Sequence, residues 1–250
     1  MPSISVIIPS LNEEQNLRLA VEDVLLSFDR LNIIGECIIV NDGSSDKTAR
    51  IADELAANYP FIQVIHHDRP AGIGRAFWEG AMKAKHEIVT LVPGDGENES
   101  IEILRYLPLM EHVDIVVPFV YNREVRSSFR RLLSKFYKAI INLSFGLLLN
   151  YMNGTVMYRR RLLLSLGLRS WGFFYQTELL VKAIRRGYLY AEVPYAVKSR
   201  AVGRSKALTL HSLIKLVLDY FRVIRAVYLS ASDEAKVLDG SATSERRKTL

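Results

Sequence analysis

The chain has 250 residues, 49% of them hydrophobic, and a formal net charge of +6 at pH 7. A chain of this length and composition can bury a substantial core, and it fits one large α/β domain better than two small ones. The single cysteine, Cys37, lies in an apolar run and excludes both a disulfide framework and a cysteine metal site. No basic region and apolar stretch precede the first predicted strand, so we expect no signal peptide and a cytosolic catalytic part.

Apolar runs and helical patterns alternate through the first half of the chain. We predict strands at residues 3–9, 33–40, 61–66 and 86–92, with helices at residues 13–28, 46–58 and 73–85 between them. This rhythm predicts a mainly parallel, covered sheet whose strands are joined by right-handed crossovers. One more strand is expected at residues 114–117, and long helices follow it.

The second half holds two long helical patterns, at residues 127–149 and 208–229, in which cations interrupt aromatic and aliphatic residues. Neither contains the roughly 20 uninterrupted apolar residues that a bilayer crossing needs. We expect helices that lie in the membrane interface, and the alternative is that both only pack on the sheet. The tail at residues 230–250 is polar and lacks periodicity, so it is predicted to be disordered.

The charge is distributed unevenly along the chain. Residues 1–118 contain 9 Lys or Arg and 19 Asp or Glu, whereas residues 119–230 contain 20 Lys or Arg and 4 acidic residues. A basic surface attracts nucleic acid, an anionic lipid face or a phosphorylated substrate, and charge does not choose among them. Because the cations stand among aliphatic stretches rather than around aromatic platforms, we expect no nucleic-acid partner.

Polar loops follow three predicted strands, at residues 9–14, 41–46 and 93–97. Since ligands of open α/β sheets bind at the carboxyl ends of the strands, we expect these loops to form one cleft. Asp42 is placed to bind a base or a ribose, while helix N-termini favour phosphate oxygens. Asn12 and Asp46 are also explained as helix N-caps. Gly72-Ile73-Gly74 opens a helix and would let backbone approach a ligand closely.

The third loop carries two carboxylates, Asp95 and Glu97, directly after an apolar strand. Carboxylates with this spacing can hold a hard divalent cation such as Mg²⁺ or Mn²⁺ against the phosphates of a substrate. The alternative is an ordinary polar turn, because Gly94-Asp95-Gly96 also suits a backbone with positive φ. The five histidines, at positions 66, 67, 86, 112 and 211, are expected to be structural or exposed.

Taken in order, these segments resemble the family 2, GT-A-type glycosyltransferases, in particular the polyprenyl-phosphate sugar transferases that include dolichyl-phosphate mannose synthase. The resemblance covers about residues 3–207 and is carried by residues 5–14, 40–46, 72–80, 130–134, 174–178, 192–194 and 200–206. It implies a GT-A, Rossmann-like sheet with flanking helices in a domain at residues 1–207. An amphipathic helix at residues 208–229 and the tail would follow it. The chain departs from the family pattern at Pro93 and Asn153, where the family carries acids.

The resemblance also implies roles for individual residues. The nucleotide sugar would be bound by Pro9, Asn12, Glu13, Asp42, Gly43, Gly74, Gly94, Asp95 and Ser205. The Mg²⁺ or Mn²⁺ ion would be held by Asp95 and Glu97, and Asp95, Arg200 and Lys206 would stabilise the leaving diphosphate. The acceptor phosphate would be received by Arg123, Arg130 and Ser134.

These roles imply an inverting glycosyltransferase that moves a sugar from a nucleotide diphosphate sugar to a polyprenyl phosphate. We expect it to be peripheral, on the cytoplasmic face of the membrane, and a separate transmembrane subunit is an expected further partner. One alternative keeps the donor and uses a sugar hydroxyl as acceptor, which would need a catalytic base. The other, favoured by the losses at Pro93 and Asn153, is a glycosyltransferase-like subunit without turnover.

Overall fold

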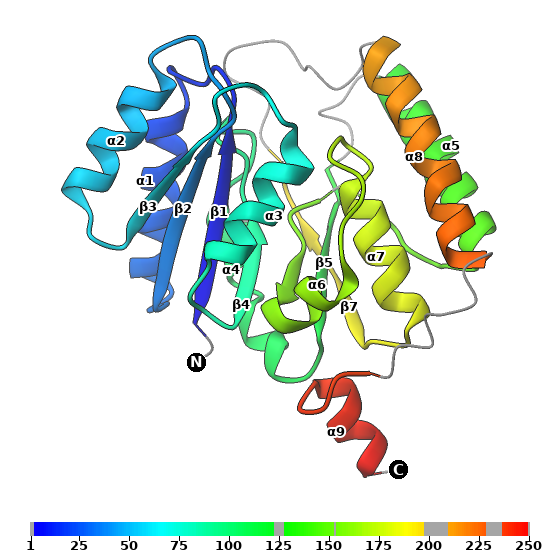
Figure 1. Cartoon of the computed structure of the whole chain (residues 1–250). Coiled ribbons are helices and arrows are strands. Elements are labelled where there is room, and N and C mark those ends of the chain that lie inside the picture. The colour runs from blue at the N-terminus through cyan, green and yellow to red at the C-terminus, as the bar shows by residue number, and fades with distance from the viewer. Residues whose placement is uncertain (1–2, 123–127, 153, 198–209, 229–236, 250) are drawn as a thin grey trace.

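The computed structural model describes residues 3–122, 128–152, 154–197, 210–228 and 237–249, with side chains for all of these except 128–130 and 210–213. These residues contain one seven-stranded sheet in the order β3-β2-β1-β4-β6-β5-β7 (Figure 1). The strands are β1 (Ile4–Ser10), β2 (Gly35–Asn41), β3 (Ile62–His66), β4 (Ile88–Leu91), β5 (Ile115–Val120), β6 (Met157–Arg159) and β7 (Tyr190–Tyr195).

The sheet is mainly parallel, as predicted. β1 pairs in parallel with β2 and β4, β2 with β3, and β5 with β7. Only β6, among the described strands, runs antiparallel to its neighbours β4 and β5. A strand of three residues is too short to produce an alternating pattern, so β6 could not be recognised in the sequence.

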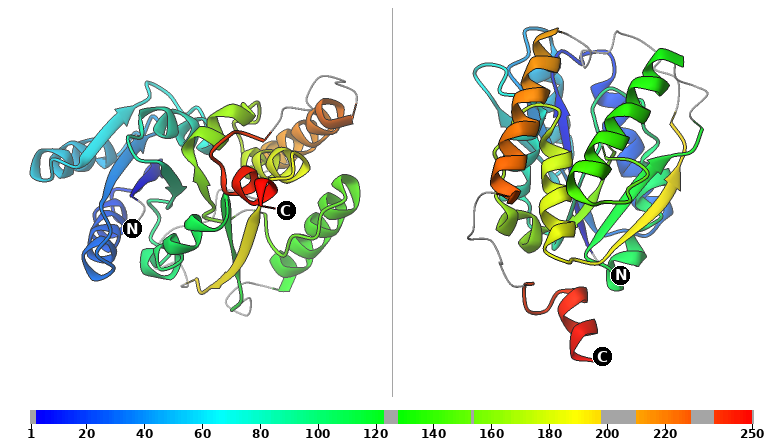
Figure 2. Two further views of the ribbon diagram at one scale, coloured as in Figure 1. Left: turned by 90° about the horizontal axis from the view of Figure 1, so that it is seen from below. Right: turned by 90° about the vertical axis from the view of Figure 1, so that its right-hand side faces the viewer.

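Helices cover both faces of the sheet, as the two turned views also show (Figure 2). They are α1 (Leu17–Arg30), α2 (Thr48–Asn58), α3 (Ile73–Lys83), α4 (Ser100–Leu104), the 3₁₀ helix η1 (Leu107–Glu111), α5 (Ser128–Phe145), α6 (Arg160–Leu166), α7 (Tyr175–Arg185), α8 (Leu210–Tyr228) and α9 (Ala242–Lys248). Side chains of β1 alternate between the faces: Val6 and Ile8 belong to the core that contains buried residues of α1 and α2, and Ile7 belongs to the core that contains buried residues of α3 and α7.

The first helix begins later than predicted, at Leu17 rather than at residue 13. Asn12 has a positive φ of 53°, which the helical conformation does not allow. Glu13 N–H donates to Thr48 Oγ1 at 2.8 Å instead of pointing along a helix axis. The preceding loop is therefore held by the neighbouring loop, and the helix starts only after it.

The helices α5 and α8 lie beside each other at the edge of the molecule farthest from α1 and α2 (Figure 1). Ser144 Oγ lies 2.8 Å from Tyr220 Oη, and Tyr228 Oη donates to Ser144 O at 2.6 Å. Ile141, Phe145 and Val223 are buried in the same core as α7. The inner faces of both helices thus pack on the protein, and the predicted helix of residues 127–149 ends at Phe145, just before Gly146 with its positive φ.

The prediction of a disordered tail at residues 230–250 is wrong for residues 237–249. This segment contains α9 and docks below β5 and β7, opposite the predicted cleft (Figure 1). The buried carboxylate of Asp114 accepts hydrogen bonds from Ala242 N at 2.8 Å and from Thr243 N at 3.0 Å. Leu189 N donates to Thr243 Oγ1 at 2.7 Å. The composition of the segment gives no sign of this contact, because the carboxylate that holds the segment, Asp114, lies more than a hundred residues earlier in the chain.

Asp114→Ala is expected to release this segment. The change removes the acceptor of two helix N-terminal N–H groups in a buried position, at a cost of about 2–4 kcal/mol. Limited proteolysis with trypsin should then cut after Arg246 and Arg247 at least about ten times faster than in the unchanged chain. Asp239→Ala, at an exposed position of the same segment, is the matched control and should leave the cutting rate unaltered.

Candidate active site

The carboxyl ends of β2, β1 and β4 lie side by side at one edge of the sheet, because these strands are parallel neighbours. The loops after them span residues 42–47, 11–16 and 92–99. Gly94 N donates to Pro9 O at 3.2 Å, which joins the third loop to the end of β1. A Cβ at position 94 would lie 2.4 Å from Ser10 Oγ, so a larger residue would displace that hydroxyl. The three loops therefore meet, as predicted, where open α/β sheets bind ligands.

The first two loops interlock through backbone-to-side-chain hydrogen bonds. Asn12 N donates to Ser44 Oγ at 3.0 Å, and Ser45 N donates to Asn12 Oδ1 at 2.8 Å. Together with the Glu13–Thr48 bond, these contacts use Asn12 and Glu13 to hold one loop against the other. The contact of both residues with a nucleotide stays a prediction.

Asp46 and Asn12 were both explained as helix caps, and only Asp46 behaves in that way. Its Oδ1 accepts from Thr48 N at 2.9 Å in the first turn of α2, while Asn12 lies four residues before the cap of α1. Burial raises the pKa of Asp46, but hydrogen bonds from Thr48 and from Glu14 N–H outweigh it and leave the pKa below its ordinary value. This contribution to stability is present above the ordinary pKa of aspartate and is lost as the pH falls through the lowered one.

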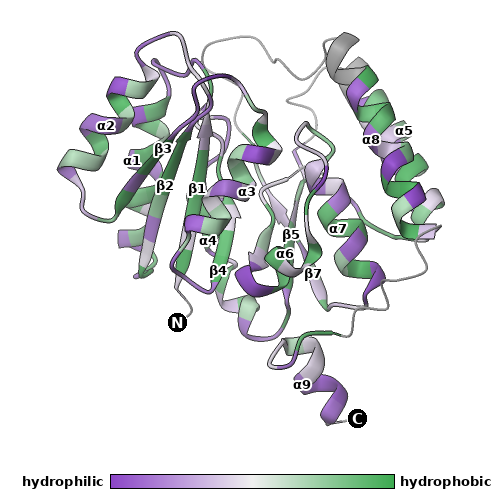
Figure 3. Cartoon of the chain, viewed as in Figure 1, coloured by the Kyte–Doolittle hydropathy of each residue, from purple (hydrophilic) through white to green (hydrophobic). Residues whose placement is uncertain are grey.

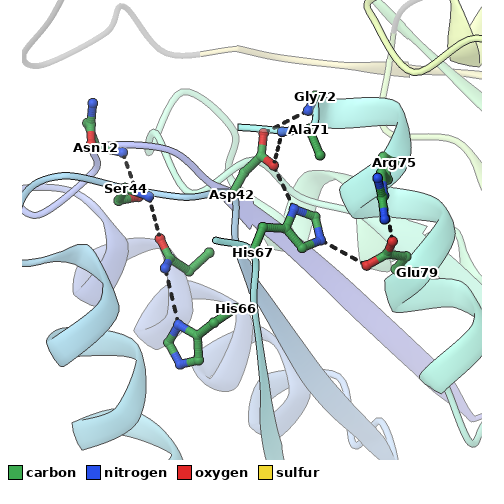
Figure 4. A network of polar contacts seen from close by, with 10 residues as sticks. Asn12, Asp42, Ser44, His66, His67, Ala71, Gly72, Arg75 and Glu79 are labelled. Carbon is green, nitrogen blue, oxygen red and sulfur yellow. Dashed lines mark hydrogen bonds and ion pairs between the residues drawn. The ribbon is translucent and has the colours of Figure 1, made fainter. Parts of the chain in front are cut away.

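Asp42, at the end of β2, is only 4% exposed and has protein partners (Figure 4). Its Oδ1 lies 2.7 Å from His67 Nδ1 and accepts from Ala71 N at 2.7 Å. Its Oδ2 accepts from Gly72 N at 2.9 Å. Asp42 therefore ties β2 to the loop that opens α3, and its contact with a nucleotide stays a prediction.

The glycines at this edge are required by the protein's own packing. A Cβ at Gly74 would lie 2.7 Å from Ser170 O and 2.7 Å from Tyr175 Cβ, and Gly74 N donates to Trp171 O at 3.0 Å. A Cβ at Gly43, whose φ is +69°, would collide with the backbone of Arg69. The close approach predicted for a ligand at Gly74 is made here by the 170–172 loop, and ligand contact at Gly43 and Gly74 stays a prediction.

The acidic loop is a turn held by its own carboxylate. Glu97 N donates to Asp95 Oδ1 at 3.1 Å, and Gly96 between them has a φ of +72°. A bridge between Asn98 and Val197 joins the end of this loop to the residues that follow β7. The backbone of this loop is thus a polar turn, which is the alternative named above to a metal-binding loop. Asp95 and Glu97 are both half-buried at the edge of the cleft.

The donor set of this loop fits a hard divalent cation. Carboxylate oxygens are the ligands that Mg²⁺ and Mn²⁺ take, and two of them leave coordination positions for diphosphate oxygens and water. Within the described residues, no group of three or more His, Cys, Asp or Glu side chains is arranged to hold a metal ion. A cation at Asp95 and Glu97 would therefore need oxygens of the substrate to complete its shell.

Several predicted site residues cannot be located relative to this loop. Arg123, Asn153, Arg200, Ser205 and Lys206 lie outside the described residues. Arg130 belongs to α5, and its side chain lies outside the described part of the chain as well. Ser134 is half-buried on the same helix.

One network of polar side chains at this edge was not predicted from the sequence. His67, one residue beyond β3, lies between Asp42 and Glu79, and Glu79 is paired with Arg75 on α3 (Figure 4). The available signal was the position of His67 at the carboxyl end of the strand next to β2. The expectation that the histidines are structural or exposed did not identify these contacts.

The predicted helix start at residues 174–178 corresponds to α7, and its glutamate holds a neighbouring loop. Glu178 is fully buried and accepts from Ser170 N at 2.8 Å and from Arg169 N at 3.1 Å. Lys182 Nζ lies 2.5 Å from its Oε1. Because the same loop contacts Gly74, Glu178 supports the start of α3 from the other side.

The acidic loop lies at the carboxyl edge of an open α/β sheet, where such folds bind ligands, and the comparisons with known proteins identify the family. Residues 5–167 match glycosyl transferase family 2, and the chain belongs to this family. The predicted resemblance is therefore confirmed, and the chain is a glycosyltransferase by family.

Two curated relatives act on polyprenyl-type lipids according to their names. Polyprenol monophosphomannose synthase of Mycolicibacterium smegmatis is 31% identical over 214 residues, which cover 80% of this chain and 79% of that protein. A dolichyl-phosphate beta-glucosyltransferase of Trichomonas vaginalis is 25% identical over 248 residues, which cover 88% of this chain and 72% of that one.

A solved structure shares the fold. Glucosyl-3-phosphoglycerate synthase of Mycobacterium tuberculosis, in complex with Mn²⁺, UDP-glucose and phosphoglyceric acid, superposes with a TM-score of 0.65. The comparison covers 90% of this chain and 79% of that chain at 23% sequence identity. The predicted GT-A type of sheet is thereby confirmed.

Proposed function

We propose that the chain is an inverting glycosyltransferase that moves a sugar from a nucleotide diphosphate sugar to a polyprenyl phosphate at the cytoplasmic face of a membrane. A phosphate oxygen of the lipid attacks the anomeric carbon while the bond from that carbon to the diphosphate breaks. A single displacement of this kind inverts the configuration and releases the nucleoside diphosphate. Because the acceptor phosphate is already an anion at neutral pH, orientation and charge neutralisation suffice without a strong base.

On the donor side, we assign the cation to Asp95 and Glu97. When bound there, Mg²⁺ or Mn²⁺ supplies positive charge against the leaving diphosphate. Nucleotide contacts are assigned to the loops at the carboxyl ends of β1, β2 and β4. The leaving diphosphate is assigned to Arg200, Ser205 and Lys206, and the acceptor phosphate to Arg123, Arg130 and Ser134.

The observation that carries the lipid acceptor is the outer surface of α5 and α8. Large apolar side chains stand exposed on both helices: Leu132, Phe136, Ile140 and Leu143 on α5, and Ile214, Val217, Leu218 and Phe221 on α8. On α8 these positions recur every three or four residues and form one stripe. An enzyme whose acceptor is dissolved in a bilayer has to contact that bilayer, and an exposed apolar stripe is the surface that makes such a contact.

Cations flank the apolar stripe and support an anionic lipid surface as its partner. Exposed lysines and arginines are Arg131 and Lys135 on α5, and Lys215, Arg222 and Arg225 on α8. Figure 3 shows hydrophobic and hydrophilic residues alternating along both helices. Helices of this composition lie in the interface, with the apolar face among acyl chains and the cations at the headgroups.

None of the described helices is both long and apolar enough to cross a bilayer. Contact through α5 and α8 is therefore proposed as peripheral. The separate transmembrane subunit remains a proposal that rests on the resemblance alone.

The experiment that tests this function is transfer of labelled sugar to a short-chain polyprenyl phosphate in detergent, from a panel of nucleotide sugars with Mg²⁺, Mn²⁺ or EDTA. We expect an organic-extractable product that needs one of the metals. Donor hydrolysis without lipid product would overturn the acceptor and favour a sugar hydroxyl. Nucleotide-sugar binding with neither hydrolysis nor transfer would favour the subunit without turnover.

A further inference from the structure

We propose that His67 is a positioning residue of the donor site, which fixes the carboxylate of Asp42 for a single hydrogen bond from the nucleoside part of the donor. The inference rests on the proposed function and deepens it, because it concerns how this chain recognises its nucleotide. His67 itself need not touch the ligand.

The ring of His67 is fixed at both ends (Figure 4). Its Nδ1 lies 2.7 Å from Asp42 Oδ1 and its Nε2 lies 2.8 Å from Glu79 Oε2, and the side chain is 9% exposed. Both ring nitrogens therefore face a carboxylate oxygen at hydrogen-bond distance. A rotation of the ring would break both contacts at once, which makes its orientation well defined.

The backbone of His67 is fixed as well. Its N–H donates to Asn41 O at 2.9 Å and so extends the pairing of β3 with β2 by one residue. The neighbouring histidine, His66, points to other partners: its Nδ1 lies 3.1 Å from Asn41 Nδ2 and its Nε2 lies 3.0 Å from Asp53 Oδ1. The two adjacent histidines therefore have separate networks, and only one of them reaches Asp42.

Glu79 is the anchor behind the ring. Arg75 Nε donates to Glu79 Oε1 at 2.7 Å, one helical turn earlier on α3. Burial raises the pKa of Glu79, but hydrogen bonds from Arg75 and His67 together with their charges outweigh it, so the pKa lies below its ordinary value. Glu79 is thus an anion at neutral pH and holds Nε2 in place.

The hydrogen bonds that Asp42 makes within the protein limit how many more its carboxylate can accept. Oδ1 accepts from Ala71 N and faces His67, whereas Oδ2 accepts from Gly72 N. An ionised carboxylate offers about four acceptor positions, so the described partners leave one, on Oδ2. Asp42 stands at the carboxyl end of β2, where the ligand of an open α/β sheet binds. One N–H or O–H of the nucleoside is the chemistry that this position accepts.

Two substitutions of His67 separate positioning from a merely structural role. The amide nitrogen of His67→Asn stands near the place of Nδ1 and keeps the contact with Asp42. That of His67→Gln reaches toward Glu79 and loses Asp42. Each variant removes one of the two contacts, so a merely structural role predicts similar effects for both.

The measurement is calorimetric titration of the full chain with GDP and with UDP, each with Mn²⁺. His67→Gln should raise the Kd of the bound nucleotide about tenfold or more, because a hydrogen bond to a charged group is lost, and His67→Asn less than about threefold. At saturating donor, kcat of both variants should stay close to that of the unchanged chain, so that the effect appears in KM. His66→Gln is the matched control and should not alter the Kd.

A second pair of variants changes Glu79 on α3, whose side chain is partly exposed, so that the fold is less affected than by a change at His67. Glu79→Ala removes the anchor and should raise the Kd about threefold to fivefold, while Glu79→Gln keeps an acceptor oxygen and should restore it. Equal effects of Asn and Gln at position 67, or no effect of either pair, would overturn the inference. If the unchanged chain binds neither GDP nor UDP, the donor assignment of the proposed function fails, and this inference fails with it.

Discussion

Asp95→Asn is expected to lower the turnover of sugar transfer by at least about 10²–10³-fold, because it removes the charge that would hold the cation at the leaving diphosphate. The fold should survive the change. Asp95 Oδ1 accepts the N–H of Glu97, and the carbonyl oxygen of asparagine can accept the same hydrogen bond. The measurement is the transfer assay with Mn²⁺, together with thermal unfolding of the variant.

Pro93 has no carboxylate that could take over the role proposed for Asp95. In the pattern that the chain resembles, position 93 carries an aspartate, whereas here the carboxylates proposed for the cation are those of Asp95 and Glu97. The matched control is Glu99→Gln, two residues farther on, which should keep turnover within a factor of about two. Turnover of Asp95→Asn within threefold of the unchanged chain would remove the metal role from Asp95.

The sheet and the position of the site could be predicted because both depend on local patterns. Continuous apolar runs identify β1, β2 and β4, since strands covered on both faces have no polar side to interrupt them. A polar loop directly after such a run must then lie at the carboxyl edge, whatever the rest of the chain does. This is why the acidic loop and the Asn12 and Asp42 loops were found together.

The contacts within the site could not be predicted, because they join residues that are distant in sequence. His67 meets Asp42 across 25 positions and Glu79 across 12. The prediction at Gly74 is a close approach of the backbone to a ligand, whereas the structure places the loop at Trp171 against this glycine. Asp114 and the docked segment at 237–249 are a further case. Hydrophobic periodicity indicates which faces of helices and strands are buried. A contact between two residues that are distant in the sequence leaves no periodic signal.

Introducing aspartate at Phe136 and Phe221 together is expected to lower binding to phosphatidylglycerol-containing vesicles by roughly 10²-fold or more. These side chains are 61% and 60% exposed, on α5 and α8 respectively. Each would lose about 2 kcal/mol of apolar burial in the interface, and each new carboxylate would meet an anionic surface. Co-sedimentation with vesicles measures the effect, and added salt should weaken the binding of the unchanged chain because its cations are exposed.

The matched control is Leu19→Asp, which replaces a side chain that is 65% exposed on α1, across the molecule from α5 and α8. It removes a comparable apolar side chain and adds the same charge, so it should keep vesicle binding near that of the unchanged chain. Both proteins should unfold at similar temperatures, because exposed positions contribute little to stability. If the double variant still binds vesicles like the unchanged chain, the stripe on α5 and α8 does not face lipid. The acceptor would then have to reach Asp95 from solution, which favours a sugar hydroxyl over a polyprenyl phosphate.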